Sequence, residues 1–206
     1  IRICGPADLR CTLSRPGMKG CNLSSRVIRD DQTLCGISIA ENADAVGANA
    51  SLLLNIPPDT HGRIAAPDCA SLAELGAKIC QIFAASVTEK AAITADSAIA
   101  QHPITQAVDG MANTYWQAAY GQESDTITLK FPKPQKVSCV VLGEHLPTGQ
   151  RIESGEIWAD GSKVAEFTVV GHKRICRFAP VDVQTLTIKI TASRTEPTLR
   201  LLEVYQ

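Results

Sequence analysis

The first strong pattern along the chain is a short apolar run without polar alternation. It covers residues 52–56, Leu-Leu-Leu-Asn-Ile, and Pro57 follows it directly. An apolar run of this kind predicts a strand buried on both faces, as in a parallel sheet. Proline donates no backbone hydrogen bond and keeps the residue before it extended, so the strand is expected to end at Ile56. Asn55 and Asp59 then lie at its carboxyl end, the functional edge of barrels built from parallel strands.

A helical period follows the run. Between residues 68 and 84, apolar side chains recur at intervals of three and four and form one stripe on a helix. Pro67 suits a first helical turn, and Asp68 places a negative charge at the positive end of the helix dipole. The spacing predicts a helix from about Asp68 to Ala84 that packs on the preceding strand. The stripe consists of Leu72, Leu75, Ile79, Ile82 and Phe83.

Beyond a connector at residues 85–100, the hydrophobic period changes from helical to alternating. Ile127, Leu129 and Phe131 alternate with polar residues, and Asp160-Gly161 is a turn signal between two apolar segments. About seven short strands at regular spacing, separated by Pro and Gly, predict a β-sandwich. The other predicted strands lie at 137–142, 157–158, 164, 167–170, 175–178, 186–190 and 201–205.

Residues 1–43 carry the weakest pattern. They contain turn-forming residues but no aromatic residue. Between Asp30 and Val46 the apolar positions fit a helix only loosely, and Gly36 interrupts them. The chain begins with Ile1, and a lone parallel strand requires neighbouring strands. The chain is therefore expected to be a piece of a longer protein, with any secretion signal upstream.

Charge and composition argue against several classes of protein. The chain has 20 basic and 21 acidic residues and a net charge of −1, so neither nucleic acid nor an anionic membrane is an expected partner. No apolar run approaches the roughly 20 residues of a membrane span. The 8 cysteines include no Cys-x-x-Cys pair, so buried thiols or isolated disulfides are expected rather than a zinc site.

The apolar run and two later motifs resemble a known family. The sequence at 46–62, which contains Leu-Leu-Leu-Asn-Ile-Pro-Pro-Asp, is similar to the last barrel strand of family 29 glycoside hydrolases, the α-L-fucosidases. Gly-Gln-Arg-Ile at 149–152 and Gly-His-Lys-Arg-Ile at 171–175 resemble motifs of the β-sandwich in the subfamily that cleaves α-1,3/1,4-linked fucose. The resemblance covers residues 44–206 well and residues 1–43 poorly.

The fold implied by this resemblance is mainly β. It is a galactose-binding-like jelly-roll β-sandwich preceded by the last strand and helix of a partial (β/α) barrel. Residues 1–88 would be the C-terminal remnant of a family 29 catalytic barrel, and residues 92–206 would be the sandwich.

The sandwich further resembles discoidin-type domains, in which one loop and a late Glu often hold a structural calcium ion. The likeness lies in Ala107-Val108-Asp109-Gly110, Thr114-Tyr115-Trp116 and Leu202-Glu203-Val204. The resemblance implies Asp109, Thr114 and Glu203 as calcium ligands, because oxygen atoms are the ligands that calcium prefers. In the alternative interpretation, Asp109-Gly110 is a turn, Thr114 begins a strand and Trp116 plugs the end of the sandwich. No other cofactor is expected.

The catalytic groups of the family are expected outside this chain. Family members are retaining enzymes, which need a nucleophile and an acid/base carboxyl about 5 Å apart. Both are implied upstream of Leu52, so no catalytic residue is assigned here and the chain alone is expected to be inactive. Arg15-Pro16-Gly17 is followed by Met18, where the family has the aromatic wall of its active site. Asp8 does not fit the family spacing and is interpreted as part of a surface turn.

Two further groups of charged residues stand out. His172-Lys173-Arg174 is either a small anion-binding spot or a solvated turn. Glu144 and Arg151 stand where the sandwich of the family faces its barrel, so the pair is predicted to form an interdomain salt bridge.

Three functions compete. The first is the C-terminal part of an exo-α-L-fucosidase that releases terminal L-fucose from oligosaccharides or glycoprotein glycans. Its partner would be the missing barrel portion, and its location would be extracellular, periplasmic or lysosomal. The second is a carbohydrate-binding module in which Trp158 and Tyr120 stack on sugars, because exposed rings form such platforms. The third is an interaction or adhesion sandwich, on which the near-neutral charge has no bearing.

Overall fold

The computed structural model describes residues 47, 56, 58, 61–84 and 86–206. These residues fall into two compact units. One ends at Gln81, and the other runs from Ile82 to Gln206 and includes Gly47. Residues 1–43 and the predicted strand, apart from Ile56, lie outside the described residues.

The first unit contains the predicted helix. Helix α2 spans Ala66–Ile82, which places its start two residues earlier than expected. Pro67 and Asp68 lie in the first turn, and the Cys69 N–H donates to the Ala65 carbonyl at 3.0 Å. Lys78 and Glu74 form an ion pair one turn apart on the surface. No helix in the described segments is long and apolar enough to cross a bilayer.

The second unit is a mainly-β sandwich, which confirms the predicted fold class. The main sheet has the order β1-β3-β6-β4-β5 with β8 paired to β3, and β2 pairs with β7. Three short 3-10 helices precede β1, β2 and β4, respectively: η2 (Thr88–Lys90), η3 (Ile104–Ala107) and η4 (Leu146–Thr148). The strands are β1 (Ala92–Ala95), β2 (Trp116–Gln117), β3 (Asp125–Gly143), β4 (Ile152–Ala159), β5 (Ser162–Phe167), β6 (Arg174–Ser193), β7 (Thr198–Leu199) and β8 (Leu201–Tyr205).

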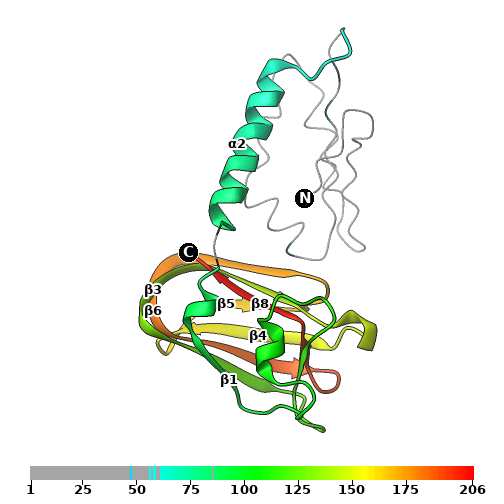
Figure 1. Ribbon diagram of the computed structural model, residues 1–206, viewed down its shortest axis with the longest axis vertical. Helices are drawn as coiled ribbons and strands as arrows, with labels where there is room; N and C mark the ends of the chain where they lie inside the picture. Colours follow the sequence, from blue (N-terminus) through cyan, green and yellow to red (C-terminus); the bar gives the residue numbers. More distant parts are fainter. Residues whose placement is uncertain (1–46, 48–55, 57, 59–60, 85) are drawn as a thin grey trace. The chain divides into compact units, whose positions relative to one another are not determined.

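Strands β3 and β6 are long. Their paired ribbons bend round from one layer of the sandwich to the other in Figure 1. Residues 127–130 of β3 pair with β1, whereas residues 139–143 pair with β8. The register with β6 shifts between Lys130 and Gln135, a segment that contains Pro132 and Pro134. The sequence analysis predicted two separate strands where β3 lies and two where β6 lies. The prolines shift the register of β3 and do not end it, because a bulge tolerates the missing donors.

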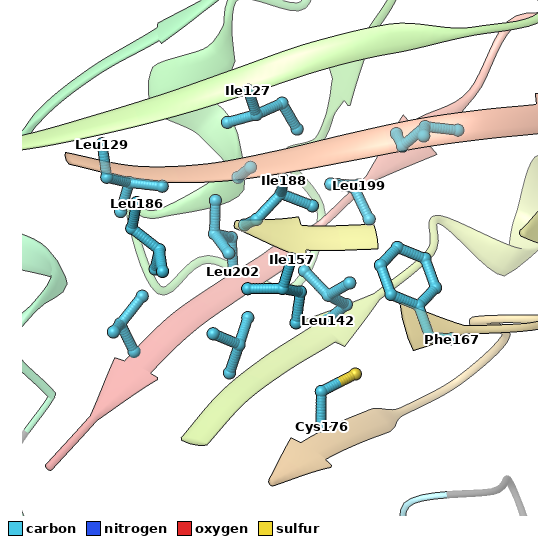
Figure 2. Packing of buried hydrophobic residues seen from close by; sticks show 14 of the residues in the cluster. Ile127, Leu129, Leu142, Ile157, Phe167, Cys176, Leu186, Ile188, Leu199 and Leu202 are labelled. Carbon is cyan, nitrogen blue, oxygen red and sulfur yellow. The ribbon is translucent and has the colours of Figure 1, made fainter. Parts of the chain in front are cut away.

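The alternation of β3 and β6 places one set of side chains in the core. Ile127 and Leu129 of β3 and Ile188 of β6 are fully buried, whereas the residues between them reach the surface. They pack with Leu142 and Leu202, which come from the part of the sheet beyond the register shift. Figure 2 shows these side chains gathered between the strands. The main core therefore lies between the two layers.

The predicted apolar run at 137–142 is confirmed as a segment buried on both faces. Val140 and Leu142 join the main core. Cys139 and Val141 point to the other face, where Tyr205 and neighbouring side chains cover them. The ring of Tyr205 meets that of Phe83 edge to face, with centroids 5.1 Å apart. Burial raises the pKa of the Cys139 thiol to about 12, so this cysteine behaves as an apolar core residue.

The four cysteines that the structure describes are all free thiols. Cys69 and Cys80 are exposed on α2, and Cys139 and Cys176 are buried in the sandwich. The buried pair fits the prediction of buried thiols. The other four cysteines lie outside the described residues.

Replacing Gly155 by Ala is expected to destabilise the sandwich by about 1–3 kcal/mol. A Cβ atom at this position would lie 2.2 Å from Cζ of Phe167 and 2.6 Å from the Lys189 carbonyl oxygen, so the ring or the strands must move. Urea denaturation followed by circular dichroism measures the change. Gly76→Ala is the matched control, because its Cβ meets nothing within 4 Å and Ala favours a helix. Equal stability of the two variants would contradict the expected crowding.

Candidate functional site

Trp158, one of the two predicted sugar platforms, lies on the outer face of the sandwich. Its indole N–H donates to Glu156 Oε2 at 2.9 Å, and Nζ of Lys189 lies 4.2 Å from its ring centroid. Lys163 pairs with both Glu156 and Glu166 beside it. One face of the ring therefore carries an ammonium group and is not open to a sugar.

Tyr120, the other predicted platform, is the most exposed large apolar residue of the described part, with 76% of its surface open. It lies in the loop after β2, and the next residue, Gly121, donates its N–H to Glu196 Oε1 at 2.9 Å. Strand β4 begins at this end with Ile152, which pairs with Ser193, and Trp158 lies six residues farther along. The two rings are therefore separated by roughly 20 Å of strand and do not form one platform.

The structure brings together two of the three predicted calcium ligands. The Thr114 hydroxyl donates to Oδ1 and Oδ2 of Asp109, at 2.9 and 2.7 Å, and the Met111 N–H donates to Oδ1 at 2.8 Å. Glu203 pairs with Val141 in the sheet and accepts a hydrogen bond from the Tyr205 hydroxyl at 2.9 Å. Where residues are described, no group of three or more His, Cys, Asp and Glu side chains could hold a metal. Calcium binding remains a prediction.

We expect Asp109→Ala to destabilise the sandwich by about 1 kcal/mol, because the substitution removes the acceptor for the Met111 N–H and the Thr114 hydroxyl. Melting curves with added calcium or with EDTA measure both effects. If the predicted calcium site forms, calcium raises the melting temperature of the unchanged protein and not that of the variant. Identical curves in calcium and EDTA would contradict calcium binding and leave the turn interpretation.

A stack of three aromatic rings forms where the chain enters β2, whereas Tyr120 follows that strand. The Tyr115 ring lies between His102 and His145, with centroid distances of 3.9 and 3.8 Å and interplanar angles of 21° and 9°. We call these three residues the ring stack. Each comes from a different loop: before η3, before β2 and after β3. His102 Nδ1 also lies 3.1 Å from Gln106 Oε1.

Two arginines give the ring stack a positive surrounding. Burial, followed by the charges of His102, Arg200 and Arg151, lowers the pKa of His145. Arg151 donates from Nη1 to the Glu196 carbonyl at 2.8 Å, and its Nη1 lies 4.0 Å from a Glu196 carboxylate oxygen. Within the described part of the chain, no carboxylate forms an ion pair with Arg200. Arg200 is therefore the less compensated of the two charges.

Two nitrogen atoms in this region, His145 Nδ1 and Arg151 Nε, are shielded from solvent and have no hydrogen-bond partner among the atoms that the structure describes. Buried polar atoms in proteins are nearly always satisfied, by protein groups or by ordered water. An ordered water can pair with each of them.

Glu144 holds the loops that carry these groups. It is completely buried, and its Oε1 accepts the backbone N–H groups of Arg151 and Ile152 at 2.7 and 2.8 Å. Its Oε2 accepts the Gly171 N–H at 2.5 Å. The predicted salt bridge between Glu144 and Arg151 is therefore wrong: Arg151 reaches the carboxylate with its backbone, because its guanidinium binds Glu196.

Glu196 links the Tyr120 loop to the Arg151 loop. Its Oε1 accepts the Gly121 N–H, and its Oε2 accepts the Thr195 hydroxyl at 2.5 Å. Together with its own backbone and Arg151, these donors lower the pKa of Glu196 to about 2. The carboxylate therefore remains charged, and this link between the loops remains formed, at any pH well above 2.

The sequence pointed to the loops of this site but not to the ring stack. His102 and His145 were two of four scattered histidines, and Tyr115 was only part of a motif. The three residues share a ring side chain, but nothing else in the sequence indicates that the rings meet, because they belong to three loops that are separate in the chain. The Arg151 and His172 motifs do converge, because Glu144 accepts the backbone N–H groups of both Arg151 and Gly171.

Comparison with known proteins gives a consistent picture. No protein-family model matches the chain. Alpha-L-fucosidase 1 of Arabidopsis thaliana is 27% identical over 174 residues, which are 79% of this chain and 34% of the relative. An Oryza sativa relative is 25% identical over 173 residues, which are 78% of this chain and 33% of the relative. The chain thus spans about a third of the curated relatives that it matches.

Solved structures extend the likeness to the fold. A Ruminococcus gnavus GH29 fucosidase in complex with fucose matches 81% of this chain and 36% of its own length, with 25% identity and a TM-score of 0.73. A family 32 carbohydrate-binding module of C. perfringens NanJ, in complex with galactose, matches 58% of this chain and 96% of its own length, with 23% identity and a TM-score of 0.52. The chain resembles α-L-fucosidases, and its C-terminal region resembles their C-terminal domain.

Proposed function

We propose that this chain is the C-terminal part of an exo-α-L-fucosidase that releases terminal L-fucose from glycoconjugates. The observation that carries the proposal is the match of about 80% of the chain to a third of several α-L-fucosidases, at 25–27% identity. In this proposal the sandwich buttresses a catalytic barrel, most of which is encoded upstream. The nucleophile and the acid/base carboxyl belong to that upstream part.

The proposal is tested by comparing this chain with a version extended by its upstream coding sequence. We expect the extended protein to hydrolyse an aryl α-L-fucoside and the 206-residue chain to be inactive. Hydrolysis by the 206-residue chain would overturn the assignment of the catalytic carboxyls upstream. An upstream sequence that encodes no barrel strands would overturn the fucosidase proposal itself.

A second function, glycan binding by the sandwich, is favoured by the exposed ring of Tyr120 and by the likeness in fold to a carbohydrate-binding module. Exposed aromatic rings supply the stacking surface that sugars need. In this function Tyr120 contacts the sugar and Trp158 does not, because Lys189 covers one face of the Trp158 ring.

Tyr120→Ala is expected to weaken retention of the chain on a fucosylated matrix by about tenfold, since stacking of one ring contributes roughly 1–1.5 kcal/mol. Affinity electrophoresis on matrices with and without the fucosylated glycan measures the effect. Trp158→Ala is the matched control and should retain the mobility of the unchanged chain. Equal mobility of all three proteins on the two matrices would contradict glycan binding by the sandwich.

A further inference from the structure

Two histidines flank one tyrosine in the region described above, and two arginines carry charge close to one of these histidines. His102 and His145 stack on the two faces of Tyr115, and Arg151 and Arg200 act on His145 through their charges. The four side chains and the tyrosine are all partly exposed. We call these five residues the cationic end of the sandwich.

The carboxylates near the cationic end are already engaged. Glu144 uses both oxygens to accept backbone N–H groups of Arg151, Ile152 and Gly171. Glu196 accepts from Gly121 and Thr195 and lies beside Arg151 alone. The charge of Arg200 therefore faces no carboxylate partner within the described residues, and an anion could bind there without displacing one.

The position of Arg200 is fixed by the backbone and not by an ion pair. The backbone N–H of Arg200 donates to the Gly143 carbonyl at 2.8 Å, and its guanidinium Nη2 lies 3.5 Å from the His172 carbonyl oxygen. Gly143 permits this close approach, because a Cβ there would lie 3.0 Å from the same carbonyl oxygen. The exposed His172 thus lies at the edge of the cationic end. The segment at 172–174, for which an anion-binding spot was one interpretation, borders it.

We propose that the cationic end binds the anionic group, a sulfate or a carboxylate, of an acidic sugar next to fucose in the glycan. Arg200 supplies the main charge, and His145 donates a hydrogen bond to the same group. Tyr120 lies on the loop that Glu196 holds to Arg151, and its exposed ring stacks on the sugar. This inference rests on the proposed glycan-related function and specifies the chemistry of the glycan.

The positive charge favours this ligand over a neutral one. A guanidinium and an imidazole around one anion form charge-assisted hydrogen bonds, which are stronger than those to a neutral hydroxyl. Because the groups are partly exposed, the interaction is screened by salt. Protonation of His145 adds a positive charge, and its pKa is lowered, so anion binding should strengthen as the pH falls below the usual histidine range.

The test uses the 206-residue chain and three fucosylated trisaccharides with one core: a neutral form, a form with one sulfate and a form with one carboxylate. Isothermal titration at low salt measures each affinity. We expect the anionic forms to bind about tenfold more tightly than the neutral form. Most of this difference in affinity should be lost at about 0.5 M salt, because salt screens the charges. Preference for the sulfate or for the carboxylate identifies the source of the anion.

Arg200→Gln should remove the preference for anionic forms over the neutral trisaccharide. Arg177→Gln is the matched control, because Arg177 is an exposed arginine on β6, where it pairs with Cys139. His145→Phe keeps a ring beside Tyr115 and removes the donor, so it should weaken the preference about threefold.

Two results would overturn the inference. The first is equal affinity for the neutral and anionic trisaccharides, which would leave glycan binding itself intact. The second is an equal loss of affinity in Arg200→Gln and Arg177→Gln, which would show only an effect of net charge. If none of the trisaccharides binds, the proposed glycan binding fails together with the inference, and this outcome is distinct from the other two.

Discussion

Replacing Glu144 by Ala is expected to be among the most destabilising single substitutions in the sandwich, with a loss of about 4 kcal/mol in the free energy of unfolding. The carboxylate is completely buried and accepts three backbone N–H groups, from Arg151, Ile152 and Gly171. Without it, all three donors lose this acceptor, and those of Ile152 and Gly171 are buried, where an unpaired donor is costly. Urea denaturation followed by circular dichroism measures the loss.

Two further variants make the Glu144 prediction specific. Glu144→Gln keeps one acceptor oxygen but turns an N–H₂ group toward a backbone donor, so about half of the loss should remain. Glu166→Ala, at an exposed position on β5, should change stability by less than about 0.5 kcal/mol. A loss below about 1 kcal/mol in Glu144→Ala, with native circular dichroism, would show that the loops do not depend on this carboxylate.

The substitution Trp116→Ala is expected to cost about 3–5 kcal/mol. The indole is fully buried in the main core, and its N–H donates to the Ser97 carbonyl at 3.0 Å. Trp116 also pairs with Leu199 in the small sheet of β2 and β7. In the chain it directly follows Tyr115 of the ring stack. Loss of the indole therefore leaves a cavity directly beside the cationic end of the sandwich.

Chemical denaturation again gives the measurement for Trp116, and the second tryptophan gives the control. Trp158→Ala removes a half-buried ring from the outer face and should cost less than about 1 kcal/mol. Trp116→Phe fills most of the cavity but leaves the Ser97 carbonyl unpaired, so an intermediate loss is expected. If Trp116→Ala and Trp158→Ala have equal midpoints and slopes, Trp116 is not the plug of this core.

Local pattern recovered the elements in which apolar residues recur with a helical or strand period. The stripe of α2 and the alternation at 127–131 follow from the geometry of a helix and a strand, so they were visible in the sequence. The lengths of β3 and β6 were not visible. Pro132 and Pro134 read as the end of a strand, because a sequence does not show whether a neighbouring strand shifts its register to accommodate them.

In the candidate site, too, the sequence indicated some of the residues and only the structure showed their contacts. Exposed aromatic type singled out Tyr120 and Trp158 equally, but only the packing showed that Lys189 lies over the Trp158 ring while Tyr120 is open. For Glu144 and Arg151, the sequence indicated that they are near each other. The structure decided that the contact runs through backbone N–H groups and that the Arg151 guanidinium binds Glu196.

The sequence by itself determined the mainly-β class, the helix before it and the resemblance to α-L-fucosidases, because these depend on residue type and on spacing within a segment. Only the tertiary structure decided which loops share one end of the sandwich. His102, Tyr115 and His145 stack because three loops, separated by up to 43 positions between His102 and His145, are brought together by strands that pair over long distances in the chain. That pairing depends on packing between layers, which no local pattern encodes.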